Sequence, residues 1–409
     1  MKILQVNTFC GIESTGRIAV DIHSVLEEQG HDSFIAYGRD QARNCSNAIK
    51  IGGDFNNYVH VALSRTLDKH GFGSKKATEE FLAKVEKLKP DVIHLHNIHG
   101  YYLNIELLFN YLKKLNKPVI WTLHDCWSFT GHCANFDYIN CDKWKTNCRD
   151  CPQLASYPKS LLVDNSKENF QRKREIFRGV ENLTIVTPSK WLGDLVKKSY
   201  LSDYSLQVIN NGIDLAVFKP TEGDFITNNN LGGKYILLGV ANVWTEKKGL
   251  DDFIELSSLL RDDTVLVLVG LDDSQRKELP ANILPISKTK DAVELAEIYT
   301  AADIFLNPTY EDNFPTTNLE AMACGTPVIT YNTGGSIESA SKECGVIVEK
   351  GDVKGLFTAV NEIREKGKKF YEHASIQRAT KLYNKNDRFL EYTELYRKMN
   401  KEAELHLMK

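Results

Sequence analysis

Short runs of apolar residues alternate with amphipathic stretches along this chain. In the first half the runs are rich in β-branched residues, as is typical of parallel strands buried on both faces; they cover residues 3–7, 33–37, 92–95, 119–123 and 184–188. Between them, apolar positions recur at helical spacing, for example over residues 18–29 and 78–88. This alternation predicts a doubly wound α/β domain with a parallel sheet.

The same alternation returns in the second half of the chain. It predicts strands over residues 235–241, 265–269, 304–307 and 328–330, with helices near 250–260 and 292–301. A turn-rich tract, Asn210-Asn211-Gly212-Ile213-Asp214, follows a predicted strand at 206–209. We therefore predict two α/β domains, residues 1–209 and 210–386, followed by an amphipathic, charged helix over 387–409.

The bulk composition fits two folded domains and argues against one large class of function. The chain has 409 residues, of which 42% are hydrophobic, and this is ample for two cores. Its formal net charge is only −3, and no basic face is interleaved with aromatic residues. We therefore expect no nucleic-acid partner.

No apolar stretch suits a signal peptide or a membrane span. Gln5 and Asn7 interrupt the apolar run near the start of the chain. The longest apolar runs, such as 265–269, have the length of strands, whereas a membrane helix needs about 20 apolar residues. We expect a cytoplasmic protein. Basic clusters such as 172–174 and 197–198 leave peripheral association with the inner surface of the cytoplasmic membrane open.

Residues 307–330, NPTYEDNFPTTNLEAMACGTPVIT, combine acidic side chains with the start of a helix. Pro315 suits the first turn of that helix, where its missing N–H costs nothing, and a Cys-Gly pair would end it. Glu320 then lies inside the helix, while Asp312 lies in the loop before it. Because a helix start presents unpaired N–H groups and a positive dipole end, this segment favours a bound diphosphate.

The same segment resembles the signature of the family 4 (group 1) retaining glycosyltransferases of bacterial polysaccharide biosynthesis. In that signature two acidic residues stand eight positions apart, a Phe follows the first, and a Glu-Ala-Met-Ala-Cys-Gly-Thr-Pro run begins at the second. The spacing selects Asp312 and Glu320 and sets Glu311 aside; Asp312 stands where the family usually has Glu. The resemblance implies the GT-B architecture, in which two Rossmann-like domains face an interdomain cleft and the final helix crosses back to the first domain. A final helix packed on its own domain stays the alternative.

On the donor side, the resemblance implies a role for each matching residue. Glu320 would bind the ribose hydroxyls of the donor, and Asp312 would bind the donor sugar with the help of nearby backbone amides. Lys248, directly before a glycine, matches the Lys that clamps the diphosphate. The other donor-binding candidates are Gly16, Asn242 at the position of the family's Arg, Lys247 as a second positive charge, Asn313, Phe314, Pro315, Thr316 and Thr317. The chain has no Asp-x-Asp motif, so we expect lysines and amides, and not a catalytic metal ion, to stabilise the leaving diphosphate.

The acceptor side is expected at strand ends of the first domain, because such ends border the ligand crevice of an open α/β sheet. His124-Asp125 follows a predicted strand and resembles the family's His at the acceptor-side edge, which implies contact with the transferring sugar. His96 lies near the end of another strand and joins them, whereas His94 is expected to be a packed structural histidine. The catalytic set implied by the resemblance is Asp312, Glu320, His124 and Lys248.

The turn after the first strand has glycines five positions apart and lacks the G-x-G-x-x-G pattern of a dinucleotide site. A nicotinamide-dependent dehydrogenase is therefore disfavoured. Gly16 and the amides around it would let a phosphate approach without a Cβ in the way. A tight turn explains this glycine equally well.

Nine cysteines are present, and four of them, Cys133, Cys141, Cys148 and Cys151, lie in an aromatic-rich insertion over residues 132–152. Four thiols this close together predict a structural zinc ion. Packed reduced thiols and disulfides stay open as alternatives. The other five cysteines are expected to be single core residues.

These features and the resemblance together predict a glycosyltransferase, and the resemblance implies that it retains the anomeric configuration of the donor. It would transfer a hexosyl or N-acetylhexosaminyl group from a nucleoside-diphosphate sugar, with UDP or GDP, to a glycan or lipid-linked glycan in bacterial surface polysaccharide synthesis. A nucleotide-sugar epimerase or hydrolase of the same architecture would also hold a sugar diphosphate. The substituted Asn242 and Asp312 positions keep a non-catalytic sugar-binding protein as a third hypothesis.

Overall fold

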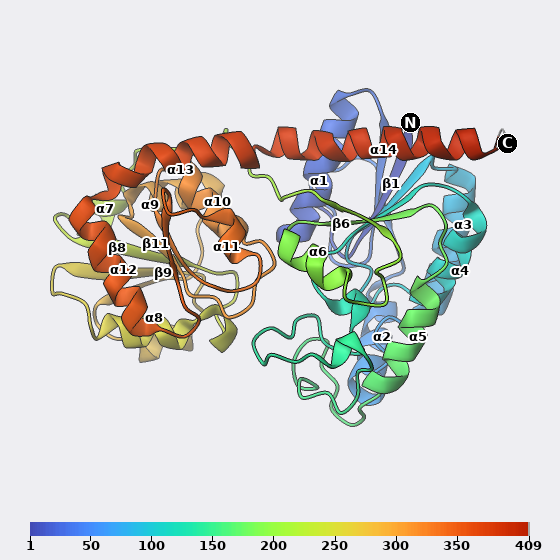
Figure 1. The fold of residues 1–409 in the computed structure, drawn as a ribbon, viewed down its shortest axis with the longest axis horizontal. Helices are drawn as coiled ribbons and strands as arrows, with labels where there is room; N and C mark the ends of the chain where they lie inside the picture. Colours follow the sequence, from blue (N-terminus) through green and yellow to red (C-terminus); the bar gives the residue numbers. More distant parts are fainter. Residues whose placement is uncertain (408–409) are drawn as a thin grey trace. The chain divides into compact units, whose positions relative to one another are not determined.

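The computed structural model describes residues 1–407. They form two compact units, shown in Figure 1. The first unit contains Met1–Asn210 and the C-terminal stretch from Phe389 onward, and the second contains Asn211–Arg388. The turn-rich tract at 210–214 therefore lies where the chain passes from one unit to the other.

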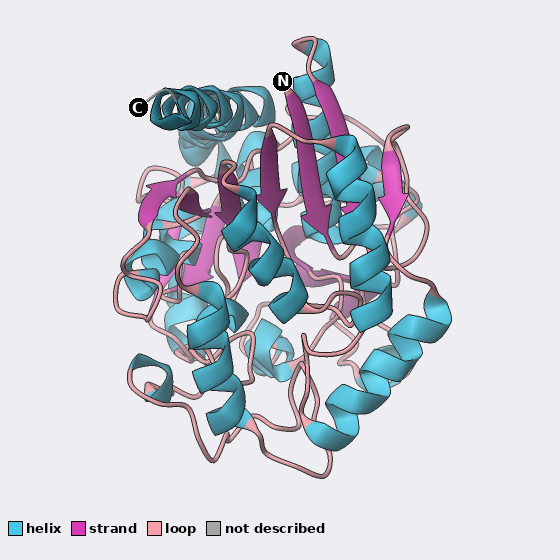
Figure 2. Cartoon of the chain, turned by 90° about the vertical axis from the view of Figure 1, so that its right-hand side faces the viewer, coloured by secondary structure: helices cyan, strands magenta, loops and turns pink. Residues whose placement is uncertain are grey.

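The first unit is built on a seven-stranded sheet in the order β3-β2-β1-β4-β5-β6-β7, and all neighbouring strands are parallel. Its strands are β1 (Lys2–Asn7), β2 (Asp32–Tyr37), β3 (Ala48–Lys50), β4 (Val92–Leu95), β5 (Val119–Thr122), β6 (Leu183–Thr187) and β7 (Ser205–Val208). Its helices are α1 (Glu13–Glu28), α2 (Asp54–Leu67), α3 (Lys75–Leu88), α4 (Ile105–Leu115), α5 (Ser166–Phe177) and α6 (Lys190–Val196), with short 3-10 turns η1 (Trp127–Phe129) and η2 (Lys143–Lys145). Figure 2 shows the strands of this unit side by side, with helices packed around them.

The second unit has a six-stranded parallel sheet in the order β10-β9-β8-β11-β12-β13. Its strands are β8 (Tyr235–Val240), β9 (Thr264–Val269), β10 (Ile283–Ile286), β11 (Ile304–Asn307), β12 (Val328–Tyr331) and β13 (Gly345–Val348). Its helices are α7 (Phe225–Asn228), α8 (Leu250–Ser257), α9 (Ala292–Ala301), α10 (Thr316–Ala323), α11 (Ser336–Ser339), α12 (Val353–Lys366) and α13 (Lys368–Tyr383), with 3-10 turns η3 (Glu246–Lys248) and η4 (Gln275–Glu278). The predicted fold class, two doubly wound parallel α/β sheets, is confirmed.

Alternate residues of the central strands enter cores on opposite faces of the first sheet. Leu4 and Val6 belong to one apolar cluster, whereas Ile3 belongs to another. This second cluster includes Phe389 and Tyr392 of helix α14 (Lys385–Leu407). Most of α14 is therefore part of the first unit's core. The last two positions of the predicted helix, 408–409, lie outside the described residues.

The sequence pattern missed the short strands at the edges of both sheets. β3 has three half-buried residues, and β10 is fully buried only at its first residue, Ile283. An edge strand has one unpaired side and fewer neighbours, so its apolar pattern is weak. Helix α1 also begins five residues earlier than predicted, which places Gly16 inside the helix.

Candidate functional site

The main cluster of predicted donor residues lies at the point where the strand order of the second sheet reverses, between β8 and β11. The loops that follow these two strands contact each other closely. Tyr310 N donates to Lys247 O at 2.8 Å. A Cβ at Gly249, whose φ is +74°, would lie 2.3 Å from Pro308 O. Only glycine allows this approach of two backbones, which brings the side chains of both loops together.

Two adjacent lysines of η3 pair with two adjacent acids of the loop after β11. Lys248 Nζ lies 2.7 Å from Asp312 Oδ2, and Lys247 pairs with Glu311. The Glu311 side chain is only 5% exposed, whereas that of Asp312 is 19% exposed. The acid selected by the eight-residue spacing is thus the more accessible one, and Glu311 is buried beside it.

Helix α10 begins in this cluster without a side-chain cap. Pro315 precedes its first residue, Thr316, with φ −68° and ψ 118°, and contributes no capping hydrogen bond. Inside the helix, buried Asn318 accepts from Asn307 Nδ2 at 2.8 Å and donates to Ser339 Oγ at 2.9 Å. These bonds fix the helix to β11 and to α11, so the N–H groups of its first turn, including that of Thr317, have a defined direction.

Glu320 lies one turn further along α10, and Tyr299 of α9 donates to its Oε2 at 3.0 Å. Burial, and then the Glu320 charge, raise the pKa of Tyr299 well above its ordinary value, so its hydroxyl stays protonated and donates. The backbone of Asp312 is held by the glycine turn after β12. Gly335 N donates to Asp312 O at 3.2 Å, and a Cβ at Gly334 would lie 2.0 Å from that oxygen.

The other predicted donor residues differ from Lys248 and Asp312 in burial and in position. Phe314 is buried and packs its ring against Tyr383, while the neighbouring Asn313 is half-buried in the same loop. Asn242 is exposed in the loop after β8. Gly16 lies in the first unit, buried, with Phe9 Cβ 3.1 Å from where its own Cβ would be. Close packing of the β1–α1 turn accounts for this glycine, and its contact with phosphate stays a prediction.

In the first unit, two histidines at strand ends form a hydrogen-bonded chain with a buried glutamine. Gln5 donates from Nε2 to Ala19 O at 2.9 Å, so its Oε1 accepts from His96 Nε2 at 3.0 Å. His96 Nδ1 lies 3.1 Å from His124 Nε2. Burial holds the pKa of His96 well below its ordinary value and lowers the pKa of His124 to about 4, so both rings are neutral. His124 therefore donates from Nε2, and its Nδ1 is the nitrogen that can accept.

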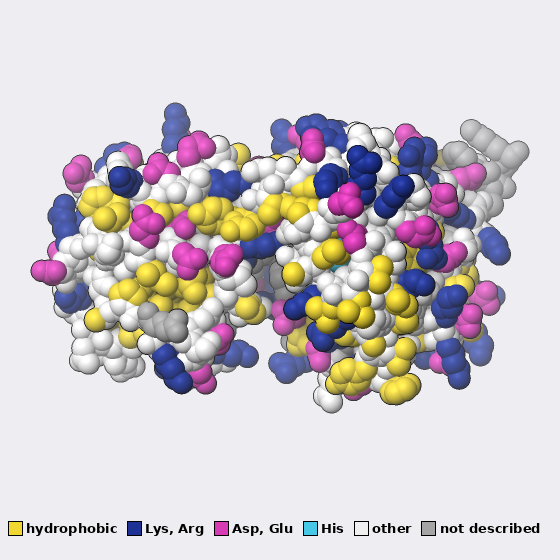
Figure 3. Space-filling model, turned by 90° about the horizontal axis from the view of Figure 1, so that it is seen from below, with side chains coloured by type: hydrophobic (Ala, Val, Ile, Leu, Met, Phe, Trp, Pro, Cys, Tyr) yellow, Lys and Arg dark blue, Asp and Glu magenta, His cyan; other side chains and the backbone are white. Residues whose placement is uncertain are grey.

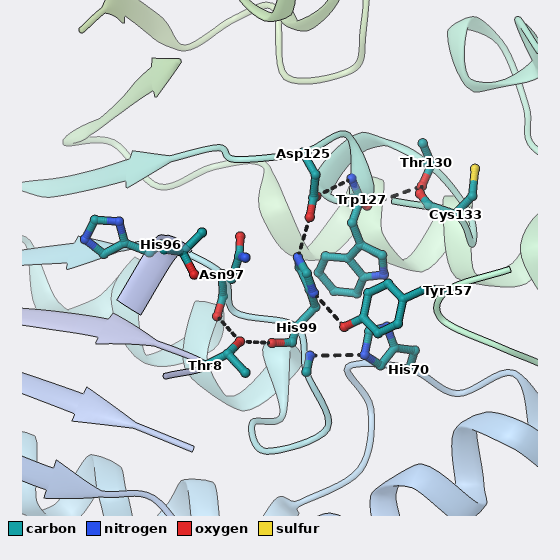
Figure 4. A network of polar contacts seen from close by, with 12 residues as sticks. Thr8, His70, His96, Asn97, His99, Asp125, Trp127, Thr130, Cys133 and Tyr157 are labelled. Atoms are coloured by element: carbon teal, nitrogen blue, oxygen red, sulfur yellow. Dashed lines mark hydrogen bonds and ion pairs between the residues drawn. The ribbon is translucent and has the colours of Figure 1, made fainter. Parts of the chain in front are cut away.

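Asp125, next to His124, belongs to a separate network with His99, which Figure 4 shows. His99 Nε2 lies 2.8 Å from Asp125 Oδ2, and His99 Nδ1 lies 2.9 Å from the Tyr157 hydroxyl. Trp127 N donates to the other oxygen of Asp125 at 2.9 Å. Burial raises the pKa of the Asp125 carboxyl, but the charge and hydrogen bond of His99 lower it by more, so the carboxyl is ionised.

The sequence prediction assigned no role to His99 or Tyr157. The run of His94, His96 and His99 was the available signal for His99, whereas nothing local marks Tyr157, which comes from the loop after the cysteine-rich insertion. His94 behaves as a structural residue. Its ring is buried and its two nitrogens lie 2.6 Å from the Tyr396 hydroxyl and 2.8 Å from Thr122 Oγ1, which fastens α14 to the sheet.

The four cysteines of the insertion line one small cavity together with aromatic side chains. The Cys133 thiol shares a hydrogen bond with Cys151, which raises the pKa of Cys133 and lowers the pKa of Cys151 to about 7. Burial raises the pKa of Cys148 to about 11. Within residues 1–407, no three His, Cys, Asp or Glu side chains are arranged so that they could hold a metal ion. The arrangement therefore gives no support to the predicted zinc ion, which stays a prediction.

Two family models together match most of this chain. The model described as Glycosyltransferase Family 4 matches residues 15–217, and the model described as Glycosyl transferases group 1 matches residues 234–366. The second match spans β8, β11 and α10, and so includes the Lys248 and Asp312 cluster.

Named relatives come from bacteria. The chain is 28% identical over 374 residues to the Escherichia coli (strain K12) glycosyl transferase WcaC, which is named for colanic acid biosynthesis; the match covers 87% of this chain and 89% of that protein. It is 32% identical over 143 residues to the N,N'-diacetylbacillosaminyl-diphospho-undecaprenol alpha-1,3-N-acetylgalactosaminyltransferase of Campylobacter jejuni. That match covers 32% of this chain and 37% of the relative.

Solved structures share the fold along nearly the whole chain. Sucrose-phosphate synthase from Thermosynechococcus elongatus superposes with a TM-score of 0.71 at 17% identity, covering 97% of this chain and 98% of that one. Anabaena Alr3699/HepE in complex with UDP gives a TM-score of 0.69 at 13% identity, covering 97% and 99%. The fold is thus that of the GT-B glycosyltransferases. With both family models and the bacterial relatives in agreement, this chain belongs to the family 4, group 1 glycosyltransferases.

Proposed function

We propose that this protein is a retaining glycosyltransferase that transfers a hexosyl or N-acetylhexosaminyl group from a nucleoside-diphosphate sugar to a glycan or lipid-linked glycan during bacterial surface polysaccharide synthesis. The observation that carries this proposal is the meeting of Lys248, Asp312 and the uncapped start of α10 at the reversal point of the second sheet. Ligands of open α/β sheets bind at such points, outside the carboxyl ends of the strands.

A donor diphosphate would compete with Asp312 for Lys248. The ion pair is only partly buried, and a diphosphate brings more negative charge than one carboxylate. The N–H groups of the first turn of α10, at Thr316 and Thr317, would bind the same phosphates. Asp312 would then accept hydrogen bonds from the sugar hydroxyls, while Glu320, oriented by Tyr299, would accept from the ribose hydroxyls.

The chemical contribution of these groups is charge stabilisation. As the sugar–phosphate bond breaks, negative charge grows on the leaving nucleoside diphosphate, and Lys248 and the α10 amides stabilise it. The leaving phosphate would help to deprotonate the incoming hydroxyl on the same face of the sugar, which retains the anomeric configuration. Positioning and electrostatics then supply the rate, with no protein nucleophile.

The first unit would hold the acceptor. His124 is neutral at pH 7 and presents Nδ1 as an acceptor, which suits a hydroxyl of the transferring sugar. The ionised Asp125, held by His99, offers a second acceptor close to it in sequence. His96 would act as a positioning residue, because it sets the orientation and tautomer of His124 through Gln5.

We place the protein in the cytoplasm, with peripheral contact to the inner surface of the membrane where lipid-linked acceptors lie. No helix among the described residues is long and apolar enough to cross a membrane. One apolar surface of the first unit supports peripheral contact: Phe55 and Tyr58 on α2 are 82% and 73% exposed, and Leu162 is 76% exposed. Leu161 N donates to Arg65 O at 2.7 Å, which brings that loop to the end of α2. Figure 3 shows hydrophobic side chains gathered on this unit as seen from below.

A transfer assay tests the proposal. The purified chain would be incubated with UDP- and GDP-sugars, with and without undecaprenyl-diphosphate-linked glycans, and nucleoside-diphosphate release and the anomeric configuration of the product would be measured. We expect release that depends on acceptor and a product with the donor's configuration. Release without acceptor would indicate a hydrolase, an altered nucleotide sugar would indicate an epimerase, and an inverted linkage would exclude retention.

A further inference from the structure

Two cysteines far apart in the sequence meet in the first unit. Cys10 follows β1, and Cys45 lies in the loop between β2 and β3. The two thiols share a hydrogen bond, and Cys45 packs against the small core cluster that contains Cys10. The expected core position is confirmed for Cys10, whereas Cys45 is only half-buried and packs beside it, so the two are not single residues.

Backbone contacts fix the two segments that carry these thiols. Arg43 N donates to Cys10 O at 3.1 Å, and Arg39 N donates to Thr8 O at 2.9 Å. Gly11 has a φ of +73°, and a Cβ there would lie 2.1 Å from Arg43 O. Since only glycine permits this approach, the backbones of the two segments that carry Cys10 and Cys45 lie directly against each other.

A buried histidine completes the cluster. His23 of α1 is 2% exposed, and its Nδ1 has no hydrogen-bond partner among the residues that the structure describes. The Cys45 thiol interacts with this ring, whose Nε2 lies 3.3 Å from Glu27 Oε2. Burial lowers the pKa of His23, but Cys45 and Glu27 raise it by more. A histidine that keeps its proton favours the thiolate form of a neighbouring cysteine.

The two cysteines differ in charge and in access. The hydrogen bond from Cys10, together with His23, lowers the pKa of Cys45 to about 5 against the effect of burial, whereas the same hydrogen bond raises the pKa of Cys10. Cys45 is half-buried and Cys10 is fully buried. A reagent in solution would therefore reach a thiolate at Cys45 first, with a protonated thiol directly behind it.

We propose that Cys45 is an oxidisable thiol and that Cys10 is its resolving partner, so that a hydroperoxide converts the pair into a disulfide. In the first step the Cys45 thiolate attacks one peroxide oxygen, the O–O bond breaks, and hydroxide leaves, which gives a sulfenic acid. In the second step the Cys10 sulfur attacks the sulfenyl sulfur, an S–S bond forms, the S–O bond breaks, and water leaves with the Cys10 proton. The thiol pair loses two electrons, and one peroxide is reduced. The bond would tie the turn after β1 to the loop after β2.

Peptide mapping of the full chain tests this directly. Cleavage after Lys and Arg places Cys10 in residues 3–17 and Cys45 in residues 44–50, each as the only cysteine of its peptide. The reduced protein would be treated with one equivalent of hydrogen peroxide at pH 6.5, its remaining thiols alkylated, and the digest analysed by mass spectrometry. We expect the cross-linked pair of these two peptides as the first disulfide to form.

Three variants separate the roles. Cys45→Ser should abolish the cross-link, while Cys10→Ser should leave a sulfenic acid at Cys45 that dimedone traps. Cys344→Ser removes a buried thiol of the second unit and should behave as the wild type. A first disulfide within the cysteine-rich insertion, or dimedone labelling of Cys10→Ser at another cysteine, would overturn the proposal. The peptide map of the wild type decides the matter even where a variant folds poorly.

A kinetic measurement checks the part played by the histidine. At pH 6 the groups that face Cys45 are the Cys10 thiol and the His23 ring, with Glu27 behind that ring. Replacing His23 with Gln removes the charge that favours the thiolate, so alkylation of Cys45 by iodoacetamide at pH 6 should slow by about 10-fold as the thiolate fraction falls. An unchanged rate would show that the histidine has no part in activating Cys45 and would contradict the assigned cluster.

Discussion

Two adjacent lysines offer a matched test of which acid serves the donor site. Lys247 pairs with the buried Glu311, and Lys248 pairs with the more accessible Asp312. If the site is built around Asp312, replacing Lys248 with Met should impair transfer with little effect on folding. Replacing Lys247 with Met should instead destabilise the second unit, because it leaves a carboxylate with a 5% exposed side chain without its lysine.

The magnitudes differ enough to be separated. Removing one partner of a buried ion pair costs about 3–5 kcal/mol of folding stability. Glu311 has interactions besides that with Lys247, so we expect a loss at the lower end of this range for Lys247→Met, about 3 kcal/mol. For a unit of this size, 1 kcal/mol shifts Tm by about 2–4 °C, so we expect a fall of about 6–12 °C for Lys247→Met. Lys248→Met should cost less than about 1 kcal/mol, since water reaches Asp312. Loss of one charge-stabilising donor should lower kcat by about 10²–10³-fold.

Two measurements are made on both variants and on the wild type. Circular dichroism melts give Tm, and nucleoside-diphosphate release gives turnover. Turnover of Lys248→Met at the wild-type level would refute the donor assignment. A Lys247→Met variant that keeps its Tm but loses turnover would show that Glu311 and Lys247 hold the donor, and that the eight-residue spacing selected the wrong acid.

Other consequences follow from the same contacts. Glu320→Gln should raise KM for the donor by about 10-fold or more, because hydrogen bonds to a charged acceptor are worth about 1.5–3 kcal/mol each. Tyr299→Phe should change KM less, because it removes only the hydrogen bond that orients Glu320. Steady-state assays of nucleoside-diphosphate release compare the two variants. Because the pKa of His124 is about 4, the pH–rate profile of the wild type should show no inflection near pH 6.5 from this ring. A strong inflection near pH 6.5 that disappears in His124→Asn would contradict the neutral state of His124. Burial lowers the pKa of Lys173 to about 7, so the unfolded state binds more protons between pH 7 and pH 10. From pH 7 to pH 9.5, the free energy of unfolding of the wild type should thus rise by about 3 kcal/mol relative to that of Lys173→Met, as measured by urea titrations. If the free energy of unfolding of both proteins changed equally with pH, the lowered pKa of Lys173 would be excluded. If the four cysteines of the insertion bind zinc, metal analysis of the purified protein should find one ion per chain, and its absence would remove that prediction.

The fold and the donor segment were predictable because their signals are local. Central strands such as β4 and β11 are buried on both faces, and their apolar runs give the same bounds in the sequence and in the structure. Helix α10 follows Pro315 directly, since proline suits a helix start and its neighbours tolerate helix. Where burial falls, as in β3 at the sheet edge, the pattern fades and the prediction failed.

The contacts that orient the candidate site could not be read from the sequence, because they join distant segments. Tyr299 reaches Glu320 from a different helix, and His99 reaches Asp125 across two strand ends. The sequence around each of these side chains contains no motif that indicates the contact. The pair of Cys10 and Cys45 shows the same limit, since only the parallel sheet brings the turn after β1 beside the loop after β2.

The central claim is that the second unit binds a nucleoside-diphosphate sugar through Asp312, Glu320 and Lys248. The most direct measurement is a thermal shift of the wild type and of Glu320→Ala with a panel of UDP- and GDP-sugars, since it needs no acceptor. At 100 times its Kd, a ligand stabilises the folded state by about 2.7 kcal/mol. We predict that at least one nucleotide sugar raises the Tm of the wild type and that the variant loses at least about half of this stabilisation, since a Kd raised 10-fold leaves about 1.4 kcal/mol at the same ligand concentration. A shift of equal size in both proteins, or none with any sugar of the panel, would contradict the account.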